Sequence, residues 1–241
     1  MKKNKRVPAL PGRQAGGRQA VVLLSGGLDS ATALYVAKKS GYRCFCLIFD
    51  YGQRHRREID SAKKISRKAG CAFAVLKINL PWKGSALLEK NIKITGVATS
   101  PRHHATRKIP LTYVPGRNII FLSFALSFAE SIKASAIFIG AHTQDYSGYP
   151  DCRMEFLRAF TQAAIYGTRA GVEKRRIAIR APLIHMSKGE IIRLGSRLHV
   201  PFDLTWSCYR GDRVPCEECD SCFYRARGFK EAGLKDPLLE K

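Results

Sequence analysis

The chain has 241 residues, 45% of them hydrophobic and 25% charged, a composition that suits one compact α/β domain with a buried core. Lys and Arg number 42 against 19 Asp and Glu, and the formal net charge of +23 favours anionic partners, either a polyphosphate or a nucleic acid. Because the basic residues are spread along the whole length, a solvated basic surface is the simpler explanation of this charge. No apolar run of about 18 residues is present, so the sequence predicts no membrane-spanning helix and a cytoplasmic location.

The chain is expected to divide into three parts. Residues 1–19 combine six basic residues with prolines and glycines, which predicts a disordered basic tail. Residues 20–200 alternate short apolar runs with helical patterns and predict an α/β domain. Within it, residues 81–110 lack periodicity and gather positive charge, which favours a lid-like insertion over an anion. Residues 201–241 carry four of the eight cysteines and predict a helical, metal-binding segment.

The first predicted strand, residues 20–23, leads through a glycine-rich turn into a helix over residues 31–39. Its two glycines let the backbone approach a ligand, and its serines place hydroxyl groups beside the free amides of the first helical turn. Such a turn favours an anion, and Asp29 within it favours a magnesium ion bound to that anion. An ordinary strand-to-helix turn is the alternative. The residues expected to hold a nucleotide are Leu24, Ser25, Gly26, Gly27, Leu28, Asp29 and Ser30.

A second strand, residues 42–49, ends at Asp50, and a helix over residues 54–69 separates it from a third strand at residues 71–78. The carboxyl ends of parallel strands lie along one edge of a sheet. We therefore expect Asp50 to lie near the glycine-rich turn and to contribute to the nucleotide site.

An apolar helix over residues 119–131 follows Arg117 and Asn118. Arginine offers two parallel hydrogen bonds to a phosphate or carboxylate, and the helix dipole favours the same anion. These two residues are therefore candidates for substrate binding. A capped helix with a surface arginine is the alternative.

The fourth strand, residues 136–141, leads into the polar and aromatic loop 142–153. Aromatic rings that stack and carboxylates that accept hydrogen bonds from amines are typical of a site for a flat heterocycle. A helix over residues 153–168 and a fifth strand at residues 176–181 follow. These alternating elements predict a doubly wound, mostly parallel five-stranded sheet.

A capping box from Ser187 to Glu190 is expected to open a helix that continues over residues 191–198. Lys188 lies in the first turn of this helix. It is expected to reach an anion at the sheet edge, and a solvated lysine is the alternative.

Four cysteines near the end of the chain have the spacing C-x7-C-x2-C-x2-C. Four thiolates at such spacing favour a closed structural zinc site, whereas an iron-sulfur cluster usually has its fourth cysteine downstream. The other cysteines, apart from Cys152, lie in apolar runs and are expected in the core. The predicted zinc ligands are Cys208, Cys216, Cys219 and Cys222.

The glycine-rich turn resembles the pyrophosphate-binding loop of the PP-loop ATP pyrophosphatases, which split ATP into AMP and pyrophosphate while adenylating an oxygen of a second substrate. Four further segments, residues 49–55, 114–118, 145–153 and 205–222, complete in the same order a resemblance to the 7-cyano-7-deazaguanine synthase family. The resemblance covers about residues 20–232. It identifies residues 20–200 as an ATP-binding domain.

The resemblance implies an activity. The family makes the nitrile precursor of queuosine and archaeosine from 7-carboxy-7-deazaguanine, ammonia and ATP, with Mg²⁺ and a structural zinc ion. It also suggests a homodimer. Asp29, Arg117 and Lys188 are the implied catalytic residues. The implied substrate-binding residues are Tyr51, Gln53, Arg117, Asn118, Asp145, Tyr149, Asp151 and Arg153.

Two features depart from the family pattern. Glu217 stands between the second and third cysteines, where the family often has glycine, and is expected to alter the turn without removing a ligand. The basic N-terminal extension is the other. No glutaminase pattern is present, which favours free ammonia as the nitrogen source.

Three other functions are compatible with parts of the sequence. A PP-loop enzyme that thiolates or adenylates tRNA would explain the charge, but Cys152 is its single candidate sulfur carrier. A zinc-bearing nucleic-acid module would not explain Asp29 in an anion-binding turn. A related enzyme that attaches a deazaguanine to a macromolecule is also compatible. Direct tRNA binding is therefore not favoured but stays open.

Overall fold

The computed structural model describes residues 17–89, 91–94, 109–142 and 148–240. Most of the predicted basic tail, the centre of the predicted lid and Asp145 lie outside these ranges. Within them, no helix is long and apolar enough to span a membrane.

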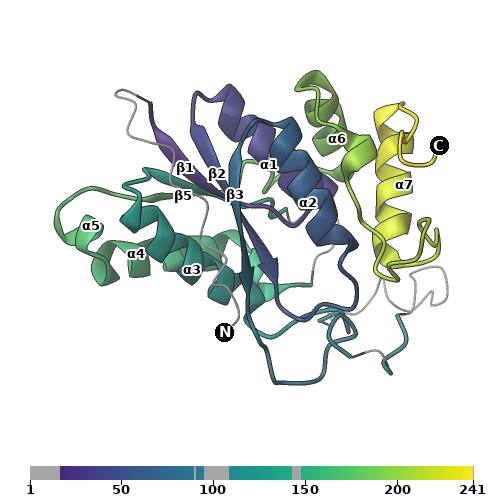
Figure 1. Ribbon diagram of the computed structural model, residues 1–241, viewed down its shortest axis with the longest axis horizontal. Helices are drawn as coiled ribbons and strands as arrows, with labels where there is room; N and C mark the ends of the chain where they lie inside the picture. Colours follow the sequence, from purple (N-terminus) through teal and green to yellow (C-terminus); the bar gives the residue numbers. More distant parts are fainter. Residues whose placement is uncertain (1–16, 90, 95–108, 143–147, 241) are drawn as a thin grey trace, which may run out of the picture.

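Five parallel strands form one sheet in the order β3-β2-β1-β4-β5 (Figure 1). The chain starts at the middle strand, moves outward to one side and then returns to the other, which is the doubly wound arrangement predicted from the sequence. The strands are β1 (Gln19–Leu23), β2 (Arg43–Asp50), β3 (Ala72–Lys77), β4 (Ala136–Phe138) and β5 (Ala178–Arg180).

Helices cover both faces of the sheet, as the strand sequences require (Figure 1). Because neighbouring residues of a strand point to opposite faces, Val22 packs in one apolar cluster and Val21 in the other. The first cluster contains residues of α1, α2, α6 and α7, and the second contains residues of α3 and α4. The α-helices are α1 (Leu28–Lys39), α2 (Arg57–Lys68), α3 (Arg117–Ser131), α4 (Met154–Gly167), α5 (Arg169–Val172), α6 (Lys188–Arg197) and α7 (Asp220–Ala232).

Three differences from the predicted elements bear on the site. Helix α1 begins at Leu28, so Asp29 and Ser30 belong to its first turn instead of preceding it. Strands β4 and β5 have only three residues each, and the short helix α5 was not predicted.

The C-terminal helix α7 packs directly against α6 (Figure 1). Glycines permit the close approach: a Cβ at Gly228 would lie 2.3 Å from Cγ of Lys188, and one at Gly189 would lie 2.8 Å from Cβ of Glu231. The cysteine-bearing segment is thus joined to the helix that carries Lys188.

Candidate active site

The glycine-rich turn lies at the carboxyl end of β1, between the sheet and α2. Gly26 has a φ of 91°, and a Cβ there would lie 2.2 Å from the carbonyl oxygen of Glu58. Glycine is therefore required both for the backbone conformation and for the contact with α2. Gly27 is the N-cap of α1, and no side chain caps that helix end. The first turn of α1 consequently keeps the anion-binding character that the sequence predicted.

Hydrogen bonds between side chains hold the shape of this turn. The Ser25 and Ser30 hydroxyl oxygens lie 3.0 Å apart, and the Ser30 hydroxyl also donates to the Gly27 carbonyl oxygen at 3.0 Å. The Ser25 backbone N–H donates to Ser30 Oγ at 3.2 Å. On the other side, a Cβ at Gly140 would lie 2.7 Å from the Ser30 backbone nitrogen, so the segment after β4 packs onto the turn.

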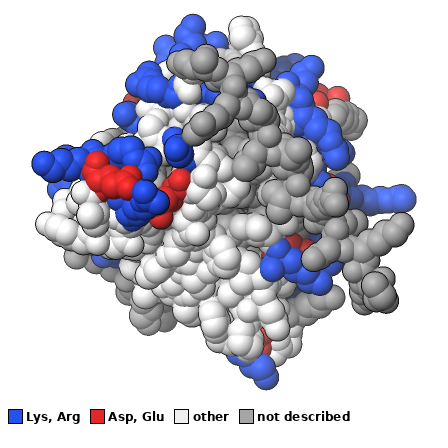
Figure 2. Space-filling view, turned by 60° about the vertical axis from the view of Figure 1, so that its left-hand side comes forward, with Lys and Arg blue, Asp and Glu red and all other residues white. Residues whose placement is uncertain are grey.

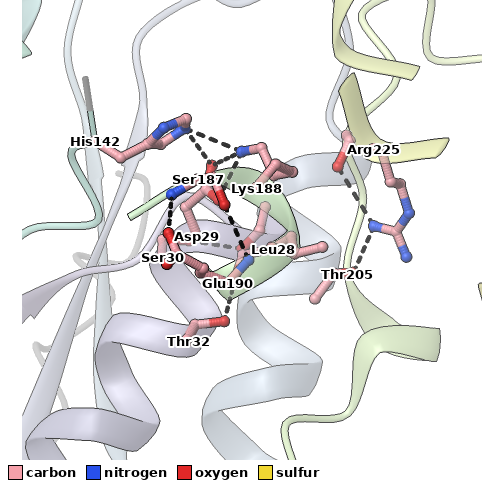
Figure 3. Close-up of polar contacts among 12 residues, drawn as sticks. Leu28, Asp29, Ser30, Thr32, His142, Ser187, Lys188, Glu190, Thr205 and Arg225 are labelled. Atoms are coloured by element: carbon pink, nitrogen blue, oxygen red, sulfur yellow. Dashed lines mark hydrogen bonds and ion pairs between the residues drawn. The ribbon is translucent and has the colours of Figure 1, made fainter. Parts of the chain in front are cut away.

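Asp29, His142 and Lys188 point toward one another from α1, the segment after β4 and the start of α6 (Figure 3). Lys188 Nζ lies 2.8 and 2.9 Å from the two Asp29 carboxylate oxygens and 3.0 Å from His142 Nε2. Burial of the Asp29 carboxyl opposes its ionisation, but the Lys188 ammonium and His142 outweigh burial and hold the pKa of Asp29 well below its ordinary value. Asp29 is therefore ionised at neutral pH.

The sequence around Lys188 fixes its position. The Ser187 hydroxyl accepts a hydrogen bond from the Glu190 backbone N–H, and the Glu190 carboxylate accepts one from the Ser187 backbone N–H (Figure 3). This capping box was predicted, although the helix already begins at Lys188. The lysine side chain is 11% exposed, which excludes the alternative of a solvated surface lysine.

A cavity of about 650 Å³ extends from the glycine-rich turn along the carboxyl edge of the sheet. One end is polar and contains the turn, His142 and Lys188. The described flanks of the predicted lid, including Lys93 and Ile109, also line it. Arg117 and a group of aromatic residues line the same cavity: Phe49, Tyr51, Phe121, Tyr149, Trp206 and Tyr209.

Arg117 begins α3 and lies against Tyr51. Its Nη1 donates to the Tyr51 hydroxyl at 3.2 Å, and the guanidinium lies 5.8 Å from the centre of the Tyr51 ring. Burial opposes the charge of Arg117, but the hydroxyl groups of Tyr51 and Tyr149 outweigh it and raise the pKa of the guanidinium. Among the described residues, no carboxylate forms an ion pair with Arg117. The guanidinium is thus available to an anionic ligand.

Other residues predicted to bind substrate form hydrogen bonds within the protein instead. The Asp151 carboxylate accepts a hydrogen bond from the Asn118 backbone N–H at 2.9 Å, and the Asn118 side chain donates to the Asp151 carbonyl oxygen at 3.2 Å. Gln53 lines the cavity, but its amide bonds the Tyr51 backbone N–H and the Phe49 carbonyl oxygen. These contacts position Asn118 and Tyr51.

Four predicted residues that the structure describes lie away from the cavity lining, and Asp151 is one of them. Asp50 is the last residue of β2, the strand next to β1, but its carboxylate lies 3.8 Å from the Arg56 guanidinium. Arg153 is the exposed N-cap of α4. Gly26 contacts α2 with its backbone.

The cavity also contains residues that the sequence analysis did not single out: Glu58, His142, Trp206 and Tyr209. His142 follows β4 at the same sheet edge as the glycine-rich turn, so the rule that placed Asp50 there also applied to it. Glu58 lies in the first turn of α2, whose N-terminus faces the same edge.

The four C-terminal cysteines converge. Their sulfur atoms lie within 4.8 Å of one another, and the backbone N–H groups of Cys216 and Cys219 each donate to a cysteine sulfur at 3.4 Å. Glu217 between them has a φ of 59°, in the left-handed region that favours glycine. The altered turn keeps all four sulfurs together, and the donor set suits a tetrahedral metal ion with soft ligands.

Trp206 connects this cluster with the glycine-rich turn. Its backbone N–H donates to the Gly26 carbonyl oxygen at 2.9 Å, and its indole N–H donates to the Cys208 carbonyl oxygen at 2.9 Å. The Arg57 guanidinium covers the indole ring, 4.7 Å from its centre. Trp206 thus contacts the cysteine cluster with its side chain and the glycine-rich turn with its backbone.

A parallel α/β sheet with a glycine-rich turn at a helix start, a partly buried Asp-Lys-His cluster and an adjoining aromatic cavity defines a nucleotide-dependent enzyme of the α/β class. The family model of the queuosine biosynthesis protein QueC matches residues 19–233, and the chain belongs to this family.

Curated relatives agree with this assignment. The 7-cyano-7-deazaguanine synthase of Trichodesmium erythraeum (strain IMS101) is 50% identical over 223 residues, which are 92% of this chain and 100% of the relative. That of Desulfitobacterium hafniense (strain DSM 10664 / DCB-2) is 50% identical over 222 residues, 92% of each chain. Among solved structures, a 4-thiouridine synthetase bound to RNA and ATP is similar with a TM-score of 0.48 and 19% identity, over 90% of this chain and 51% of the other.

Proposed function

We propose that this chain converts 7-carboxy-7-deazaguanine, ammonia and ATP into 7-cyano-7-deazaguanine. Its curated relatives are named 7-cyano-7-deazaguanine synthase. The observation that supports it best is the single cavity in which the glycine-rich turn adjoins Arg117 and a group of aromatic rings. A nucleotide at the turn would then place its α-phosphate near a carboxylate held by Arg117.

The reaction needs two activations because a carboxylate and an amide are both poor electrophiles. Attack of the carboxylate oxygen on the α-phosphorus of ATP forms an acyl adenylate and releases pyrophosphate. Ammonia displaces AMP with loss of one proton and leaves the amide. A second ATP adenylates the amide oxygen with release of pyrophosphate and one nitrogen proton, and elimination of AMP with loss of the remaining nitrogen proton leaves the nitrile.

Two of the three proposed catalytic residues, Lys188 and Arg117, would stabilise charge directly. The first turn of α1, with Ser25 and Ser30, would hold the pyrophosphate, and Lys188 would stabilise its developing charge. Arg117 would hold the reacting carboxylate. None of them forms a covalent bond with substrate, so the rate would come from positioning and electrostatics.

Two metal ions fit these residues. Magnesium suits Asp29, whose carboxylate is ionised and 28% exposed toward the cavity, and it would neutralise polyphosphate charge there. Zinc suits the four cysteine sulfurs and leaves no open coordination position, so it would stabilise the fold around Trp206. Residues 20–200 would form the ATP-binding domain and residues 201–241 the zinc-binding segment, with residues 81–110 as a lid.

We also propose a homodimer. Figure 2 shows a broad surface without Lys, Arg, Asp or Glu, next to clusters of charged side chains, although the chain is strongly basic. Ile119, Phe124, Tyr166 and Val172 are exposed on α3, α4 and α5. Phe124→Glu should convert the dimer into a monomer by light scattering. A wild-type protein that is monomeric at micromolar concentration would contradict this.

The proposed activity is tested by mass spectrometry of reactions that contain ATP, Mg²⁺, ammonium and 7-carboxy-7-deazaguanine. The wild-type protein should form the nitrile together with AMP, and Asp29→Ala should not. If no nitrile forms and ATP is split only when bulk tRNA is added, the tRNA-modifying function replaces the proposal. Retention of tRNA at physiological salt would point the same way.

A further inference from the structure

Glu58 is a cavity-lining carboxylate that has no role in the proposed chemistry. It lies in the first turn of α2, and its backbone carbonyl contacts Gly26 of the glycine-rich turn. Its side chain borders the same cavity as Arg117, Tyr51 and Tyr209. Glu58 thus lies where the nucleotide end of the cavity meets the aromatic part.

The Glu58 side chain is partly buried and lacks the partner that such an acid normally has. Among the described residues, none forms a hydrogen bond or an ion pair with it, and Arg117 acts on it only through its charge at a distance. Burial is the main reason that the pKa of Glu58 is raised to about 7, against the lowering effect of Arg117. A cavity-lining acid without a protein partner is free to bind a ligand.

The other described acids near the cavity already have partners within the protein. The Asp29 carboxylate bonds Lys188, the Asp151 carboxylate bonds the Asn118 backbone, and Asp220, which lines the cavity, also has an interaction partner. Glu58 is therefore the acid best placed to accept hydrogen bonds from the amines of a heterocyclic base. This role was expected of the loop that contains Asp151.

The proposed substrate has complementary polarity. A 7-deazaguanine presents two neighbouring donors, the ring N1–H and the 2-amine, and a carboxylate accepts from both with its two oxygens. The 7-carboxylate lies across the ring system from this edge. The cavity offers the reverse pattern, an acceptor at Glu58 and a cation at Arg117, with aromatic rings between which a flat base can stack.

We propose that Glu58 is the specificity-determining residue for the guanine-type edge of the substrate and binds its N1–H and 2-amine. The inference rests on the proposed function for its substrate. It predicts that the protein discriminates against a base that lacks the 2-amine, because the carboxylate would then lose one of its two hydrogen bonds in a buried site.

The test is a comparison of binding affinities for two free bases, 7-carboxy-7-deazaguanine and its analogue without the 2-amine, by isothermal titration calorimetry. The wild-type protein should prefer the guanine-type base by about ten- to hundred-fold. Glu58→Gln should lose most of this preference, because an amide cannot accept with both atoms. Asp60→Asn, an exposed acid on the same helix, should keep the preference and serves as the matched control.

Glu58→Gln should fold, because it replaces an unpartnered acid by a neutral side chain of the same shape. A melting curve checks this, and Glu58→Asp, with the shorter reach, provides the second variant and should weaken the preference. A folded Glu58→Gln protein that discriminates between the two bases like the wild type would overturn the inference. If that protein also has slow turnover, Glu58 would act in proton transfer instead of base recognition. That result would leave the proposed function intact, whereas a wild-type protein that makes no nitrile would contradict the proposed function itself.

Discussion

The Lys188 ammonium lies 2.8 and 2.9 Å from the two carboxylate oxygens of Asp29, although 159 residues separate the two in the chain. Three independent features produce this contact. Asp29 is fixed in the first turn of α1, Lys188 follows a capping box, and Gly228 lets α7 press the lysine stem into place. The pair connects the glycine-rich turn with the C-terminal half of the chain.

Replacing Lys188 by Met should reduce nitrile formation by about 100-fold or more, because the charge that develops on pyrophosphate loses a fixed cation. The control is Lys230→Met, an exposed lysine on α7, which should keep the wild-type rate. Steady-state kinetics with ATP as the varied substrate measures both. A Lys188→Met protein with wild-type turnover would remove this residue from the mechanism.

The same variant should change the pH dependence of stability. Since folding lowers the pKa of Asp29, ionised Asp29 stabilises the protein above the ordinary aspartate pKa of about 4, and this contribution is lost as the pH falls. Lys188→Met should therefore lower the melting temperature more at pH 7 than at pH 3. Equal shifts at both pH values would show that the ion pair does not stabilise the fold.

Gly26→Ala should destabilise the protein by about 3 kcal/mol or more, through a strained positive φ and a clash with α2. Gly52 also has a positive φ, 83°, but a Cβ there meets no atom within 4 Å. Gly52→Ala should accordingly cost only about 1–2 kcal/mol. Urea unfolding of both variants separates the cost of backbone strain from the cost of the clash with Glu58. Equal losses in the free energy of unfolding would show that the clash does not destabilise the protein.

Metal removal should weaken ATP binding through Trp206. The chain has two tryptophans, so Trp82→Phe leaves Trp206 as the only indole reporter. A chelator should change the Trp206 emission and reduce the affinity for ATP by about tenfold or more, since the Gly26 carbonyl loses a positioned donor. Unchanged ATP affinity after complete metal removal would contradict the connection. Cys219→Ser should be poorly soluble, because loss of a metal ligand removes the ion that stabilises this segment.

Glu217→Gly should stabilise the metal-bound protein by about 1 kcal/mol, because glycine adopts the observed positive φ without strain. Lys133 has a similar φ of 56° at the end of α3, far from the cysteines in sequence. Lys133→Gly should raise the melting temperature without changing zinc affinity. Competition with a chromogenic chelator measures the zinc affinity of both variants. A rise in zinc affinity in Glu217→Gly alone would show that the turn at Glu217 strains the metal site.

The sequence predicts the five strands in their order along the chain, because apolar runs, glycines and a capping box are local signals. It also predicts which edge of the sheet holds the site. The partners of the predicted side chains were not. The Asp151 carboxylate bonds a helix start and Asp50 lies beside Arg56, since three-dimensional proximity decides which acids remain free. Glu58 was missed because it is an ordinary helix residue until packing places it in the cavity, whereas the position of His142 after β4 already indicated the sheet edge.

The central claim is that ATP activates an oxygen of the substrate at the glycine-rich turn by adenylation. The most direct test uses 7-carboxy-7-deazaguanine with both carboxylate oxygens labelled with ¹⁸O and mass spectrometry of the nucleotides after the reaction. The account predicts that both labelled oxygens leave in AMP, one at each activation, while pyrophosphate stays unlabelled. Label in inorganic phosphate or pyrophosphate, or AMP without label, would contradict it.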